Sequence, residues 1–127
     1  MKISNCQYAR PFGSTQEDIM NDPHYSQMHA PEQLYNIWWT GSVDVWQIGC
    51  IFYCMCNFHL PYEGATEFLT YKNIELKGYE PVDGSIHTEE VKTMVDLLLE
   101  KDPLIRPDIH GVLNHPIVVA KRQEYGL

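Results

Sequence analysis

The stretch SVDVWQIGCIFYCMC, residues 42–56, decides the fold of this 127-residue chain. Its apolar-rich part, residues 45–56, is shorter than the roughly 20 residues that an α-helix needs to cross a bilayer. We therefore expect a core helix that begins with Ser42 as its N-cap and ends near Asn57. Apolar side chains point in every direction around this helix, which is typical of a helix in the middle of a structure.

The sequence that follows the central helix predicts three more helices. Residues 66–77 read as a helix that stops at Gly78. Thr88 caps an amphipathic helix whose apolar residues recur at helical spacing and which ends before Asp102. Pro107 begins a last short helix.

The sequence that precedes the central helix is more irregular. Residues 2–10 read as a short strand and a turn, and residues 11–29, with their prolines and glycine, read as a loop. A chain of 127 residues fits one domain. The expected fold class is therefore mainly α, in a single domain with one short strand at the N-terminus.

The composition is that of a globular, acidic domain. Apolar residues make up 44%, and nine basic against seventeen acidic residues give a net charge of -8. Nucleic acids and anionic membrane surfaces repel such a chain, so neither is expected as a partner. No N-terminal segment has the order of a secretory signal. We expect a cytoplasmic protein.

The cysteines fit the same compartment. Cys50, Cys54 and Cys56 lie within the predicted helix and, with Cys6, read as reduced thiols. Zinc binding is the alternative, because Cys56 and His59 are close in sequence. No second pair with ligand spacing follows, so no metal site is expected.

Three motifs along the chain carry a resemblance to a known family. Residues 30–32 read Ala-Pro-Glu, residues 42–50 read Ser-Val-Asp-Val-Trp-Gln-Ile-Gly-Cys, and residues 102–107 read Asp-Pro-Leu-Ile-Arg-Pro. In this order and spacing they resemble the helical C-terminal lobe of a eukaryotic-type Ser/Thr protein kinase. Residues 58–62 lean toward the Numb-associated or NIMA-related kinases.

The resemblance covers nearly the whole chain and divides it. Residues 1–127 are similar to one partial kinase domain. Within it, residues 1–32 correspond to a degenerate activation segment, residues 33–118 to the helical lobe and residues 119–127 to a tail.

The resemblance implies structural roles for Glu32, Asp44, Trp46 and Arg106. Glu32 and Arg106 are expected to form an ion pair that ties the activation segment to the helical base, because the guanidinium fork suits a carboxylate. Trp46 belongs to the family's central helix. In kinases the residue that matches Asp44 holds the backbone of the catalytic loop, which this sequence lacks. Either Asp44 turns to solvent here, or the protein is longer.

The sequence also lacks the residues with which kinases transfer phosphate. It has no Gly-x-Gly-x-x-Gly, no Val-Ala-Ile-Lys-like strand and no His-Arg-Asp. Asn5, Cys6 and Gln7 stand where the family has Asp-Phe-Gly, and a neutral amide is a poor ligand for Mg²⁺. We expect no catalytic, cofactor-binding or metal-binding residue in this chain, and Mg-ATP binding only by a longer active form.

The segment before Ala-Pro-Glu departs from the family's substrate-docking loop. Tyr25 stands where kinases place a Thr that contacts the catalytic Asp, and Met28 stands where a Tyr would pack. Ser26 lies between them. By the resemblance these residues are a remnant of that loop, which puts peptide-substrate binding in doubt.

Four functional hypotheses follow. The first is a pseudokinase-type module that binds protein partners, with a kinase as one candidate partner. The second is a fragment of an active Ser/Thr kinase whose N-terminal half is missing from this sequence. The third is a degenerate copy without function, and the fourth is an unrelated helical module. Mg-ATP binding by a longer form distinguishes the second from the first.

Overall fold

The computed structural model describes residues 27–34 and 40–127. The helices within them are α2 (Pro31–Leu34), α3 (Ser42–Asn57), α4 (Glu67–Leu76), α5 (Glu89–Leu98), α6 (Ile109–Leu113) and α7 (Pro116–Glu124). No strand occurs among the described residues, and the mainly α class is confirmed. The expected strand at residues 2–10 lies outside the described residues.

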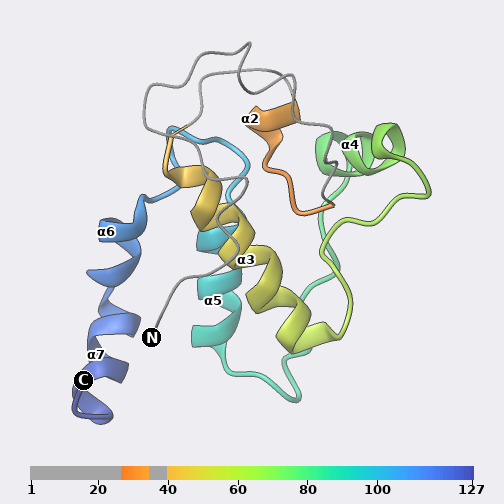
Figure 1. The fold of residues 1–127 in the computed structure, drawn as a ribbon. Helices are drawn as coiled ribbons and strands as arrows, with labels where there is room; N and C mark the ends of the chain where they lie inside the picture. Colours follow the sequence, from red (N-terminus) through yellow and green to blue (C-terminus); the bar gives the residue numbers. More distant parts are fainter. Residues whose placement is uncertain (1–26, 35–39) are drawn as a thin grey trace.

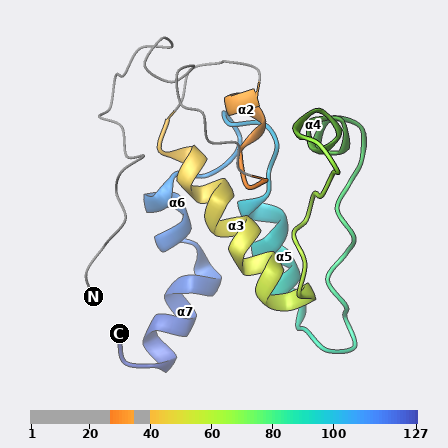
Figure 2. The same ribbon diagram turned by 45° about the vertical axis from the view of Figure 1, so that its right-hand side comes forward.

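Helix α3 runs through the centre of the molecule (Figure 1). Helix α5 packs along it, and α2 contacts α4 near one end. Helices α6 and α7 contact each other and lie on the side of α3 away from α4, as both views show (Figure 2). The central helix therefore separates two groups of smaller helices.

One face of α3 forms the centre of the core. Val45, Trp46, Cys50 and Tyr53 are almost completely buried on it. Gly49 lies on the same face, where α3 meets α5. This packing places the first turn of α3 beside α2 and the loop that follows α5.

Two expectations for α3 were wrong. The helix is not buried all round, because Ile48, Ile51 and Met55 are exposed along one side. Ser42 is not its N-cap: the cap is Gly41, without a side-chain hydrogen bond, and Ser42 is the first helical residue. The Ser42 hydroxyl instead shares a hydrogen bond of 2.6 Å with the Thr40 hydroxyl.

The other helices begin at local capping groups. Thr66 accepts a hydrogen bond from the backbone of α4 and Thr88 from that of α5, which confirms both predicted starts. The last predicted helix begins later than expected, since Asp108, not Pro107, caps α6. His115 caps α7, a further helix that the sequence did not predict and that crosses the expected boundary at residue 118.

An aromatic cluster joins α3 to the segments before and after α4. Trp46 stacks on Tyr62 with ring centroids 5.9 Å apart, and Tyr79 meets Tyr53 and Tyr62 edge-on. The Tyr53 hydroxyl donates to a backbone carbonyl, and the Tyr79 hydroxyl donates to Asp96. Burial raises the pKa of Tyr62 above its usual range, and its hydroxyl has no partner among the described residues.

The close approach of α3 and α5 depends on Gly49. A methyl group there would lie 2.9 Å from both Leu98 Cβ and Leu99 Cδ2. We expect Gly49→Ala to lower the free energy of unfolding by about 1–3 kcal/mol, because the helices must move apart. Gly78→Ala is the matched control, since no atom lies within 4 Å of its added methyl. Urea unfolding measures both, and equal effects would contradict the packing described here.

Tyr62→Phe tests the aromatic cluster. The raised pKa means that Tyr62 contributes stability that is fully present below its unfolded pKa of about 10 and is lost as the pH rises above it. At pH 8 we expect the variant to lie within about 1 kcal/mol of the parent, because the lost hydroxyl has no partner. Between pH 8 and pH 11 the variant should lose less stability than the parent. Urea unfolding at both pH values measures this, and equal losses would show that Tyr62 ionises freely.

Candidate functional site

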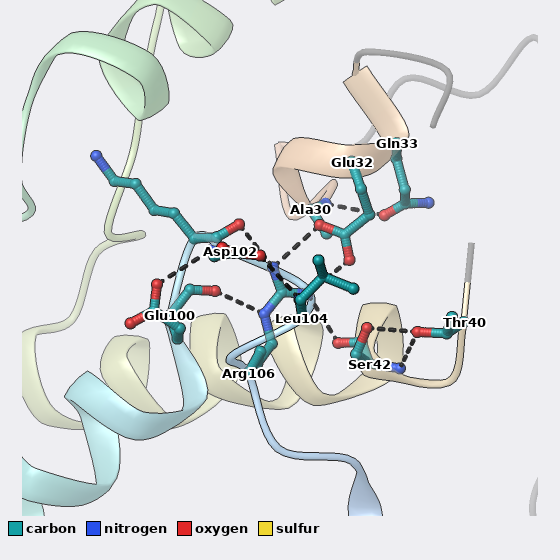
Figure 3. A network of polar contacts seen from close by, with 10 residues as sticks. Ala30, Glu32, Gln33, Thr40, Ser42, Glu100, Asp102, Leu104 and Arg106 are labelled. Atoms are coloured by element: carbon teal, nitrogen blue, oxygen red, sulfur yellow. Dashed lines mark hydrogen bonds and ion pairs between the residues drawn. The ribbon is translucent and has the colours of Figure 1, made fainter. Parts of the chain in front are cut away.

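Glu32 and Arg106 form a buried, two-pronged ion pair (Figure 3). Arg106 Nη1 donates to Glu32 Oε1 at 2.7 Å, and Nη2 donates to Glu32 Oε2 at 3.0 Å. Glu32 is 1% exposed and Arg106 is 3% exposed. The structure thus brings together the two residues that the sequence paired.

The rest of the guanidinium binds backbone carbonyls. Nη1 also donates to the carbonyl of Ser42 at 2.9 Å, Nε donates to that of Glu100 at 2.6 Å, and Nη2 donates to that of Lys101 at 3.3 Å. The guanidinium carbon lies 5.1 Å from the centre of the Trp46 ring. All five N–H donors of Arg106 are therefore used.

A tight turn positions Arg106. The carboxylate of Asp102 accepts from the backbone of Leu104, and the Asp102 carbonyl accepts from the backbone of Arg106 itself. An Asp side chain that caps its own turn favours this local geometry in a loop. The turn points the guanidinium toward α2 and the start of α3 (Figure 3).

Helix α2 positions Glu32 in a similarly local way. Pro31 is its first residue, where the missing N–H costs nothing. The backbone N–H of Ala30 donates to the Gln33 side chain at 2.8 Å, and the Gln33 N–H donates to the Ala30 carbonyl at 3.0 Å. Ala30 is completely buried, which anchors this turn in the core.

The ion pair is a structural anchor with no spare capacity. Its charges neutralise each other, and each donor of Arg106 already has an acceptor. A group saturated in this way offers nothing to a ligand. The sequence predicted the Glu32 carboxylate as the partner of Arg106 but not the three backbone carbonyls. The residue type itself indicated further acceptors, because one carboxylate can use only some of the five N–H donors of a guanidinium.

Asp44 and Trp46 lie in very different surroundings. Trp46 is completely buried between Tyr62 and Arg106, and its indole N–H has no partner among the described residues. Asp44 is exposed in the first turn of α3, where the helix dipole favours a negative charge. Trp46 therefore packs against the ion pair, whereas Asp44 faces solvent.

The expected substrate-loop remnant is described only in part. Met28 is half-buried and packs against the main core cluster. Tyr25 and Ser26 lie outside the described residues, as does Asn5.

The described residues offer little to a metal or a phosphate. Within residues 27–34 and 40–127, no three His, Cys, Asp or Glu side chains gather closely enough to hold a metal ion. A pocket of about 300 Å³ lies beside the ion pair, but its lining is mainly apolar and includes Pro31, Ile74 and Pro103. The helices of this part of the chain are all too short or too polar to span a bilayer.

Cys50, Cys54 and Cys56 are free thiols. Burial raises the pKa of Cys50 to about 12, although the Arg106 guanidinium acts in the opposite direction. Burial also raises the pKa of Cys56. Because the thiolate is the reactive form, Cys50 behaves as a small apolar core residue.

Glu32→Ala tests the anchor. The variant leaves the Arg106 charge buried without its counter-ion, so we expect the free energy of unfolding to fall by about 3–5 kcal/mol. Glu124→Ala is the control, because it removes the exposed Lys121–Glu124 pair and should cost about 0–1 kcal/mol. Urea unfolding of both variants measures the difference. A loss below about 1 kcal/mol for Glu32→Ala would contradict the anchor role.

Comparison with known proteins identifies the domain to which this anchor belongs. The family description "Protein kinase domain" matches residues 2–118. The chain is 26% identical over 106 residues to probable serine/threonine-protein kinase nek2 of Dictyostelium discoideum, which covers 84% of this chain and 24% of that protein. It is 26% identical over 125 residues to G2-specific protein kinase nimA of Emericella nidulans, which covers 98% of this chain and 17% of that protein.

A yeast kinase provides both a sequence and a structural match. The chain is 35% identical over 93 residues to serine/threonine-protein kinase RAD53 of Saccharomyces cerevisiae, which covers 69% of this chain and 11% of that protein. The crystal structure of the Rad53 kinase domain and SCD2 matches with a TM-score of 0.62 and 32% identity, over 72% of this chain and 36% of that one.

The chain spans a quarter or less of the length of these three curated relatives. The family match covers most of the chain, and the structural match to a solved kinase domain covers 72% of it. The chain therefore belongs to the protein kinase family, and its helices correspond to the C-terminal lobe of a Ser/Thr protein kinase domain.

Proposed function

We propose that this chain works by binding protein partners and not by transferring phosphate. The observation that carries the proposal is the contrast between the two sides of α3. One side holds a complete core around Trp46 and the Arg106 anchor. The other side leaves Ile48, Ile51 and Met55 open to solvent. Several exposed apolar side chains along one side of a helix are typical of an interaction site.

The residues at the kinase chemistry positions support the same proposal. Phosphate transfer needs a carboxylate to hold magnesium and a second one to orient the acceptor hydroxyl. The sequence has Asn5 at the first position and no His-Arg-Asp to supply the second. Asp44 is exposed and has no catalytic loop to hold. A kinase is one candidate partner, because the chain retains the lobe's scaffold without its chemistry.

The second candidate function is part of an active Ser/Thr kinase. The relatives nek2, RAD53 and nimA are all protein kinases, and the chain covers only 11–24% of their length. In that case the groups that hold Mg-ATP lie on chain outside these 127 residues. The intact Glu32–Arg106 anchor is compatible with both functions, so it does not choose between them.

Isothermal titration of Mg-ATP distinguishes the two functions. We expect no saturable heat from the 127-residue chain, and none from its Asn5→Asp variant, because one restored carboxylate does not replace the missing phosphate-binding groups. The same titration is made on the full-length native protein, whose intact mass is determined first. Saturable Mg-ATP binding by the native protein, together with phosphate transfer to a protein substrate, would overturn the binding-module proposal.

A further inference from the structure

The loop that joins α4 to α5 contains a dipeptide with a chemistry of its own. Asp83 is followed by Gly84, and no other Asp or Asn of the chain precedes a glycine. Both residues are exposed, and Thr88, the cap of α5, follows them. Because glycine has no Cβ, its nitrogen can approach a neighbouring side chain more freely than the nitrogen of a larger residue.

The amide nitrogen of Gly84 is free to react. Its N–H has no acceptor among the described residues, whereas the three amides that follow it all donate to Asp83. The Asp96–Leu97 bond provides the contrast, because it lies inside α5, where helical hydrogen bonds hold the main chain. Of these two bonds, only Asp83–Gly84 combines an exposed carboxylate with an unbonded, unhindered amide.

This arrangement permits a reaction that needs only water. The Gly84 nitrogen attacks Cγ of Asp83, an N–Cγ bond forms, and the amide proton leaves with the carboxyl hydroxyl as water. The product is a five-membered succinimide ring. Water then adds to the former main-chain carbonyl carbon and breaks its bond to nitrogen, so that the chain continues through the Asp83 side chain. The composition is unchanged, and the main chain is longer by one carbon.

Ser85 restrains this reaction. Its backbone N–H and its hydroxyl each donate to Oδ1 of Asp83 at 2.8 Å. These two bonds hold the pKa of Asp83 below its usual value, and nearby His87 and Lys92 act in the same direction. Because the carboxyl group loses its oxygen as water only when it is protonated, the folded loop keeps most of Asp83 in the unreactive form.

Asp83 also organises the loop, so its modification has a structural effect. The Asp83 carbonyl accepts from the Ile86 N–H at 3.2 Å and from the His87 N–H at 2.9 Å. The Nε2 atom of His87 in turn lies 3.3 Å from the carbonyl of Cys56, near the end of α3. A main chain that is longer by one carbon at Asp83 cannot keep these contacts in place.

We propose that Asp83–Gly84 is a spontaneous modification site, where the main chain isomerises to an isoaspartyl linkage under the restraint of Ser85 and loosens the loop from α3. The modification accumulates with the age of the protein. It depends neither on phosphate transfer nor on a partner, so it goes beyond the proposed function.

The test follows the 127-residue chain during several weeks at neutral pH and body temperature. Peptide mapping by reversed-phase chromatography separates the isomers, and electron-transfer fragmentation locates the isoaspartyl linkage at unchanged mass. We expect the isoaspartyl fraction at Asp83 to exceed that at Asp96 at least ten-fold. Equal fractions at the two positions, or none at Asp83, would overturn the proposal.

Three variants test the chemistry and its restraint. Asp83→Glu should abolish the signal, because its ring would need six members, and Asp44→Glu is the matched control at another exposed carboxylate. An isoaspartyl signal that survives Asp83→Glu would place the reaction elsewhere and overturn the proposal. Ser85→Ala should isomerise at least two-fold faster than the parent chain. An unchanged or slower rate in this variant would overturn the restraint by Ser85.

Hydrogen exchange tests the structural effect on the isomerised chain after its chromatographic separation. We expect the His87 amide, which donates to Asp83, to exchange at least ten-fold faster than in the parent chain. The Leu99 amide, which donates to Val95 at the end of α5, should change less than two-fold. Equal exchange of the His87 amide in the two forms would show that the loop stays in place and would overturn the loosening from α3.

Discussion

The fold depends on the need to bury one guanidinium group. A buried positive charge is tolerated only when its donors are all satisfied and its charge is balanced. Arg106 meets both conditions by drawing in a carboxylate from α2, a carbonyl from the first turn of α3 and two carbonyls from the loop after α5. Arg106 thereby holds together three segments that are distant in sequence. The face of the Trp46 ring covers its guanidinium.

Much of this could be predicted from the sequence, because some patterns carry their own physics. The pairing of Glu32 with Arg106 was expected because the motifs that contain them resemble those of the kinase family, and because a guanidinium fork suits a carboxylate. Helix α5 has a capping Thr88 and a regular apolar face, so its start and its packing both follow. For Asp44 the sequence left two outcomes open, and the side chain lies exposed at the N-terminus of α3, where a carboxylate needs no protein partner.

Other features could not be predicted, for reasons that are equally physical. An apolar sequence indicates which side chains prefer burial, but not how many neighbours exist to bury them, so the exposure of Ile51 and Met55 was missed. Ser42 is a good N-cap residue by type, yet the helix begins one position earlier and its hydroxyl turns to Thr40. Helix α7 has only weak apolar periodicity, and His115 followed by Pro116 was the local signal for its start.

The ion pair also sets the order in which the chain can assemble. It joins residues 74 positions apart, and closing a flexible loop of that length costs about 4 kcal/mol of chain entropy beyond a constant. The pair therefore forms at a lower entropic cost once α3 and α5 have shortened the effective loop. Helix α2 has only four residues, which is too short for a helix to be stable by itself. Because it has so few hydrogen bonds of its own, α2 relies on the Glu32–Arg106 pair, which fastens it to helices already packed against one another.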